Sequence, residues 1–184
     1  MDAITNLHTR ISFPRVDGPI PDESAIENIF KAALRAPDHG QLRPWRFLRI
    51  QGESLAKLGQ LFAEASLQDK PDLDEEALTK IANKAERAPL IITTISESAP
   101  HPKIPEFEQD LSAAAATQSM LLAAHAQGIG AVWRTGAMAE HPHVKTGLGL
   151  RDHEKIIAFL YIGTPKGSAK TIRPLAIEDF VQDW

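Results

Sequence analysis

Apolar residues recur at helical spacing along much of the chain. After the start signal PDES at residues 21–24, one face of a predicted helix carries Ile26, Ile29, Phe30, Ala33 and Leu34. Pro37 is expected to end this helix, because proline cannot continue it. The other predicted helices are Asp2 to Thr9, Ser54 to Leu67, Leu73 to Arg87, Pro105 to Gly128 and His143 to Gly147.

Shorter apolar runs between these helices predict strands. The run LIITTI at Leu90 to Ile95 is β-branched and typical of a central strand. Further strands are predicted at Pro44 to Ile50, Gly130 to Trp133 and Lys155 to Ile162. Because helices fall between strands in pairs and do not strictly alternate with them, the order favours an α+β sandwich over a doubly wound parallel sheet.

The size and composition fit one domain spanning residues 1–184. The chain is 43% hydrophobic, and its 20 Lys and Arg residues against 24 Asp and Glu give a net charge of −4 without long charged runs. This charge distribution argues against a nucleic-acid groove or a membrane-binding face. No secretory signal is expected, and Leu111 to Ala126 contains too many polar residues for a membrane span.

Several familiar sites are not supported by the sequence. The chain has no cysteine, which excludes disulfides, thiolate ligands and a cysteine nucleophile, and is compatible with a cytoplasmic location. GIG at Gly128 to Gly130 lacks the third glycine of a dinucleotide fingerprint and follows a helix. His141 and His143 offer two imidazoles, but an isolated HPH is more often the start of a surface helix, so no metal is expected.

Three segments carry side chains suited to binding a ligand. The connection APDHGQLRPW at Ala36 to Trp45 is dense in functional groups for a simple turn, and His39 within it has no evident packing role. Arg10 and Ser12 can grip one phosphate, although a solvated turn is an alternative. AVWRTG at Ala131 to Gly136 places aromatic, cationic and hydroxyl groups at a strand end, where they can stack on a planar ligand and donate hydrogen bonds.

Two other candidate residues, Arg35 and His125, also have structural explanations. Arg35 in the last helical turn complements the helix dipole, and His125 is typical of a hydrogen-bonded packing residue.

The tail after Pro165 closes with the apolar residues Leu175, Ile177, Phe180 and Val181. Such a tail is expected to pack on its own body or on a partner subunit.

Five segments together resemble the nitroreductase family, in particular its small bacterial branch of NAD(P)H nitroreductases. They are RIS from Arg10, RAPDHGQLRPW from Arg35, RAPLIIT from Arg87, AAHAQGIGAVWRTG from Ala123 and EKIIAFLYIGTP from Glu154. The resemblance covers nearly the whole chain. It implies an α/β/α sandwich with a mixed, mainly antiparallel central sheet, and a homodimer with FMN at the subunit interface.

The same resemblance implies an activity. Hydride passes from NADH or NADPH to the flavin N5 and then to an electron-poor acceptor such as a nitroaromatic or a quinone. Cofactor chemistry of this kind requires no catalytic dyad or triad from the protein. Two alternatives remain open: a flavin carrier or sensor without nicotinamide turnover, and a cofactor-free binding protein.

The resemblance also implies roles for individual residues. FMN contacts are expected from Arg10, Ile11, Ser12, Arg35, His39, Trp133, Arg134 and Thr135, with His39 supplied across the dimer. The nicotinamide nucleotide is expected at Ala123, Ala124, His125, Ala126, Gln127 and Gly128. Arg35 is the candidate for stabilising negative charge at N1 and O2 of the flavin. Because Ile11 stands where many members have a second arginine, Lys170 or Arg173 is hypothesised to complete the phosphate site.

Overall fold

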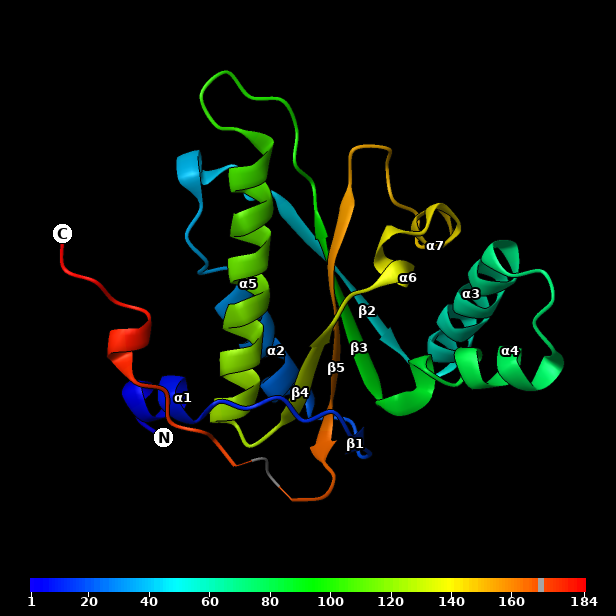
Figure 1. Cartoon of the computed structure of the whole chain (residues 1–184), viewed down its shortest axis with the longest axis horizontal. Helices are drawn as coiled ribbons and strands as arrows, with labels where there is room; N and C mark the ends of the chain where they lie inside the picture. Colours follow the sequence, from blue (N-terminus) through cyan, green and yellow to red (C-terminus); the bar gives the residue numbers. More distant parts are fainter. Residues whose placement is uncertain (169–170) are drawn as a thin grey trace.

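The computed structural model describes residues 1–168 and 171–184 and consists of three layers, with a sheet between two sets of helices (Figure 1). The helices are α1 (Ala3–Thr9), α2 (Glu23–Ala33), α3 (Glu53–Asp69), α4 (Glu75–Ala82), α5 (Glu106–Ala126), α6 (Ala137–Glu140) and α7 (Pro142–Gly147). The strands are β1 (Val16–Asp17), β2 (Trp45–Gln51), β3 (Leu90–Ser96), β4 (Gly130–Arg134) and β5 (Lys155–Pro165). Single turns of 3₁₀ helix lie at His39–Gln41, Ala85–Arg87 and Ile177–Asp179.

The strand order is β1-β5-β3-β2, and β4 also pairs with β5. Every pairing in the described part of the chain is antiparallel, so the parallel component of the predicted mixed sheet is not found there. The reason lies in the position of β5. Strands β3 and β4 run in the same direction, but the same residues of β5 pair with both, so β5 separates them.

Each face of the sheet carries its own apolar core. On one face, α2 and α5 pack against the sheet through side chains such as Ile29 and Met120, both fully buried. On the other face, α3, α6 and α7 pack against the sheet, and the ring of Phe62 on α3 meets the ring of Phe159 on β5 edge to face. Because both faces are covered, β3 is buried along its whole length, which confirms its prediction as a central strand.

The helix boundaries follow local chemistry. Asp2, Asp22 and Asp74 accept hydrogen bonds from the backbone N–H three residues later and so cap α1, α2 and α4. The helix predicted from Leu73 to Arg87 is shorter, because α4 ends at Ala82 and a separate 3₁₀ turn follows. Strand β1 and helix α6 were not predicted, because elements this short show no periodic pattern in the sequence.

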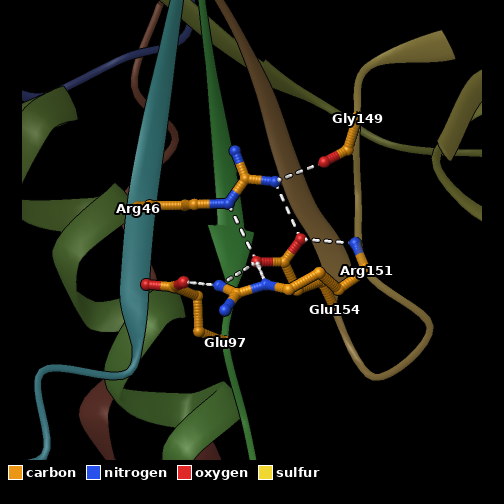
Figure 2. A network of polar contacts seen from close by, with 5 residues as sticks. All are labelled: Arg46, Glu97, Gly149, Arg151 and Glu154. Carbon is orange, nitrogen blue, oxygen red and sulfur yellow. Dashed lines mark hydrogen bonds and ion pairs between the residues drawn. The ribbon is translucent and has the colours of Figure 1, made fainter. Parts of the chain in front are cut away.

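A polar network links β2 to the loop that leads into β5 (Figure 2). Arg46 on β2 bonds both carboxylate oxygens of Glu154, and its Nη2 also donates to the carbonyl of Gly149. Arg151 donates to Glu154 through its side chain and its backbone N–H, and it pairs with Glu97 at the end of β3. The network therefore joins three neighbouring strands at one end of the sheet.

The C-terminal tail leaves the sheet after β5 and extends past α5 (Figure 1). All described residues from 171 onward are exposed, and the apolar side chains of Leu175, Ile177, Phe180 and Val181 are each more than half accessible. The described part of the tail therefore does not pack on its own body, and its packing on a partner subunit stays a prediction. Among the described residues, no helix is long and apolar enough to span a membrane.

Candidate functional site

Three adjoining cavities form a trough beside the end of β4. The first, of about 640 Å³, is lined by Phe62, Lys84, Arg87, Trp133, Arg134, Thr135, Gly136, Ala137, Met138, Phe159 and Tyr161. The second, of about 610 Å³, shares Arg87 and Arg134 with the first and adds Pro14, Arg15, Val16 and Lys166. The third, of about 240 Å³, shares Pro14, Arg15 and Lys166 with the second and adds Ser12, Phe13, Gly167 and Ser168.

The end of β4 places three predicted residues in the first cavity. Trp133 is held by a hydrogen bond from its Nε1 to the carbonyl of Ile157, at 3.1 Å. The guanidinium carbon of Arg134 lies 5.4 Å from the centre of the Tyr161 ring, and its Nη2 donates to the Pro14 carbonyl. Thr135 is exposed and precedes Gly136, whose φ of +87° turns the chain toward α6.

The N-terminal segment brings Ser12 to the opposite end of the trough. The backbone N–H of Phe13 donates to the carbonyl of Ala131 at 2.9 Å, which fixes this segment against β4. Arg10 and Ile11 are half-buried immediately before it, but they do not line the three cavities. The structure therefore brings Ser12 into the same trough as the segment from Trp133 to Thr135, although the two are far apart in the sequence.

The electrostatics of the trough favour a ligand that is both planar and anionic. Its lining contains five cations, Lys84, Arg87, Arg134, Arg15 and Lys166, and no carboxylate, although one of the five, Lys166, is paired with Asp17. The Nε atom of Arg134 is buried and has no hydrogen-bond partner among the described residues. Aromatic rings and cations in one depression suit an elongated ligand with a conjugated ring at one end and a phosphate at the other.

Arg35 lies in a different cavity, of about 380 Å³, which shares no lining residue with the trough. Its lining is Leu34, Arg35, Ala36, Pro37, Asp38, Gln41, Arg43 and Trp45. His39, in the same connection, places Nδ1 2.9 Å from Oε2 of Glu108 on α5. Within one chain, the structure does not bring Arg35 and His39 to the end of β4.

The backbone of this connection is unusual in a way that points to function. Gln41 and Arg43 adopt φ values of +55° and +50°, a region that non-glycine residues rarely occupy. The backbone N–H of Arg43 donates to Asp38 Oδ2, and the N–H of Trp45 donates to the Arg43 carbonyl, which together hold the loop in shape. Strained, well-fixed loops of this kind concentrate at binding sites.

The segment predicted for the nicotinamide nucleotide, Ala123 to Gly128, forms the end of α5. His125 Nε2 lies 3.1 Å from the hydroxyl of Thr9 on α1, and burial together with the nearby charge of Arg10 lowers the pKa of His125. The amide of Gln127 donates to the carbonyl of Ala25 and accepts from Asn28 on α2. These contacts match the packing interpretation of His125, and the nicotinamide assignment stays a prediction.

The HPH segment begins a helix in the structure. His141 Nδ1 accepts a hydrogen bond from the His143 backbone and caps α7, while its Nε2 lies 3.5 Å from Asp69. His143 pairs with Glu64 on α3. In the described part of the chain, no group of three or more His, Cys, Asp or Glu residues is arranged to hold a metal ion.

Four cations that line the trough were not among the predicted site residues: Arg15, Lys84, Arg87 and Lys166. Of these, only Arg87 lies in a segment that carries the family resemblance, and no pattern singled it out. Lys166 pairs with Asp17 at 2.6 Å, and this hydrogen bond lowers the pKa of Asp17. A signal was present in Lys84 and Arg87, which are three residues apart and so share one side of a helical turn.

Comparisons with known proteins show the family to which this chain belongs. The profile of the Nitroreductase family matches residues 16–164. The Escherichia coli protein named "Putative NAD(P)H nitroreductase YdjA" is 39% identical over 93% of this chain and 92% of its own length. A Haemophilus influenzae protein of the same description is 40% identical over 98% of both chains.

Solved structures show the same fold. A nitroreductase-like family protein from Bacillus cereus superimposes with a TM-score of 0.85 at 20% identity, covering 100% of this chain and 96% of the other. A Bacteroides fragilis nitroreductase with bound FMN gives a TM-score of 0.74 at 18% identity, covering 100% and 99%. Because the family profile and the sequence relatives both span most of the chain, this protein is a member of the nitroreductase family.

Proposed function

We propose that this protein is an FMN-dependent oxidoreductase that uses NADH or NADPH to reduce electron-poor acceptors such as nitroaromatics or quinones. The single observation that supports this most strongly is the trough itself, in which Ser12 and the segment Trp133 to Thr135 lie at opposite ends of a cationic, partly aromatic depression. Bound FMN in the Bacteroides fragilis relative supports the same cofactor for this chain. The absence of cysteine accords with a cytoplasmic location.

The residues present fit FMN along the length of the trough. Ser12 and Arg15 would offer a hydroxyl and a cation to the phosphate, and Lys166, which also pairs with Asp17, would offer a second cation. Trp133 to Thr135 would hold the ring end, where the buried Nε of Arg134, which has no partner among the described residues, has unused donor capacity. FMN bound there would supply the hydride and electron transfer, so the chain needs to provide only binding, orientation and charge.

We infer that the working unit is a homodimer in which a second copy completes each site. Arg35 and His39 lie apart from the trough within one chain, so they reach a ring at the end of β4 only if the partner supplies them. An exposed apolar surface fits this assembly: Ile4 and Leu7 on α1, Leu111 on α5, and the tail residues Leu175 and Phe180 are all more than half accessible.

The deciding measurement is the visible absorption spectrum of the purified protein, followed by anaerobic addition of NADH and, separately, of NADPH. A flavin spectrum that either nucleotide bleaches is the expected result and also identifies the preferred donor. A flavin spectrum that persists with both donors would favour a carrier or sensor. A protein that is colourless and binds no added FMN would overturn the proposal at its cofactor.

A further inference from the structure

The ring end of the trough carries more positive charge than FMN requires. Lys84, Arg87 and Arg134 all line the first cavity, and no carboxylate lines it with them. At the other end, Arg15 lines the cavity together with Ser12, and Lys166 lies there as the ion-pair partner of Asp17. Because the flavin ring is neutral when oxidised and gains at most one negative charge on reduction, at least two cations at the ring end have no counterpart on the cofactor.

Two of these cations are also uncommitted within the chain. Arg134 donates to the Pro14 carbonyl and lies over Tyr161, so its position is fixed by the protein. In contrast, Lys84 and Arg87 are exposed, and neither forms an ion pair or a side-chain hydrogen bond within residues 1–168 and 171–184. Their charges are therefore available to a ligand that enters from solvent.

The placement of Lys84 and Arg87 suits a ligand that stacks beside the end of β4. They lie at the turn between α4 and β3, three residues apart, and the buried Ala85 anchors this turn in the core. The same cavity is bounded by the aromatic side chains of Phe62 and Tyr161. A depression with one aromatic wall and two unpaired cations at its rim selects for a planar ligand that carries an anionic group.

We propose that the preferred acceptors are aromatic anions, namely nitroarenes or quinones bearing a carboxylate or sulfonate that Lys84 and Arg87 bind. This inference rests on the proposed function and specifies its substrate class. The reaction balances as for any nitroarene: NAD(P)H and one proton supply two electrons and two hydrogens, the nitro group becomes a nitroso group, and one water leaves. Lys84 and Arg87 position the acceptor and exchange no atoms with it.

The test compares 4-nitrobenzoate with 4-nitrobenzyl alcohol, which has the same ring without the charge. Steady-state kcat/KM for both acceptors is measured with the FMN-loaded wild type, the Lys84→Gln and Arg87→Gln variants and their combination. We expect the benzoate-to-alcohol ratio of kcat/KM to fall by about tenfold in the double variant, because charge-assisted hydrogen bonds at an exposed rim are lost. Comparing the ratio between proteins cancels the different reduction potentials of the two acceptors.

The matched control is Lys80→Gln, one turn earlier on α4. Lys80 is exposed and pairs with Glu76 at the protein surface, and it does not line the trough. Its removal changes the net charge by the same amount as Lys84→Gln but is expected to leave the ratio within about twofold, because surface charges are screened by salt. An equal fall in the control would mean that net charge alone sets the preference, and it would overturn the proposal.

A binding measurement separates this proposal from the proposed function. In oxidised holoenzyme, benzoate is titrated against the flavin absorbance band, and its dissociation constant is expected to rise about tenfold in the double variant. The same samples are first shown to hold FMN and to be bleached by the nicotinamide donor. If bleaching holds and the benzoate constant and acceptor ratio do not change, the inference about Lys84 and Arg87 is wrong while the proposed function stands.

The nicotinamide donor is the other source of anionic groups. Its dissociation constant is obtained from the concentration dependence of the anaerobic bleaching rate in wild type and double variant. If the donor constant rises about tenfold while the benzoate-to-alcohol ratio stays the same, the two cations serve the phosphates of the donor, and the proposed acceptor class is overturned.

Discussion

Arg46 and Glu154 form a two-point ion pair in which the Glu154 side chain is completely shielded from solvent. Arg46 Nε lies 2.9 Å from Oε1, and Nη2 lies 2.7 Å from Oε2. Arg151 adds its own backbone and side-chain hydrogen bonds to the same carboxylate (Figure 2). A buried carboxylate whose oxygens are saturated by charged donors contributes to stability only while every partner is in place.

The first prediction follows from this arrangement. Glu154→Gln removes the buried negative charge and leaves Arg46 without its counterion at the edge of the sheet. We expect the free energy of unfolding at pH 7, measured by urea denaturation, to fall by about 3 kcal/mol. The control is Glu23→Gln, which breaks the exposed pair between Glu23 and Arg49. Similar losses in both variants would show that burial of Glu154 is not the source of its effect.

The second prediction is the pH dependence of the same difference. Hydrogen bonds from Arg46 hold the pKa of Glu154 far below its usual range, despite burial that opposes this. A carboxylate whose pKa is lower in the folded protein than in the unfolded chain stabilises the folded protein at pH values above the unfolded-chain pKa. This contribution is lost as the pH falls toward the pKa of the folded protein. The unfolding free-energy gap between wild type and Glu154→Gln is therefore expected to narrow below about pH 4.3, by about 1.4 kcal/mol per pH unit.

Other carboxylates with lowered pKa values do not affect this comparison. Asp22 and Asp110, for example, are present in both proteins, so their contributions cancel in the difference. A gap that stays constant between pH 7 and pH 3 would contradict the assignment of the low pKa to Glu154.

The third prediction concerns Arg35, proposed to reach the flavin ring across the dimer and to stabilise negative charge at N1 and O2. Arg35→Ala is expected to slow anaerobic reduction by NAD(P)H by about tenfold while FMN affinity changes much less. Stopped-flow absorbance measures the first quantity and fluorescence titration the second. Lys31→Ala serves as control, because Lys31 lies on α2, which ends at Ala33 before Arg35, and pairs with Glu27. Equal reduction rates in wild type and Arg35→Ala would count against this role.

The fourth prediction concerns the phosphate end of the trough, where Ile11 provides no charge. Arg173 is exposed within a single chain, and Lys170 lies outside the described residues. If either tail cation completes the phosphate site, its replacement by alanine is expected to weaken FMN binding to the apoprotein by about tenfold. Unchanged FMN affinity in both variants would refute the hypothesis that the tail compensates for Ile11.

The fifth prediction tests the dimer through the exposed tail. Leu175 and Phe180 are 73% and 71% accessible in the single chain, and in the proposed dimer we expect a partner subunit to bury them. Replacing both with serine is expected to raise the dimer dissociation constant about a hundredfold, as measured by sedimentation. The control is Leu67→Ser, an exposed leucine on α3 in the opposite layer. A flavin-loaded wild type that sediments as a monomer would refute the homodimer itself.

The sequence by itself determined most of the local structure. Periodic apolar positions predicted the long helices α2, α3 and α5 and the buried strand β3, because burial of one face or of both faces leaves a repeat in the chain. The resemblance of five segments to one family also predicted the layered fold. It also predicted Ser12 and Trp133 to Thr135 as cofactor-binding residues, and these line the same trough in the structure.

Only the tertiary structure decided which distant groups meet. Because β5 lies between β3 and β4, the described strands pair only in the antiparallel direction, whereas the prediction had been a mixed, mainly antiparallel sheet. The same packing placed Lys84 and Arg87 beside the end of β4, and it placed Arg35 in a separate cavity that shares no lining residue with the trough. Local periodicity reports whether a side chain is buried, whereas the neighbours of a cation at the surface depend on strand order and on long-range contacts that leave no repeat in the sequence.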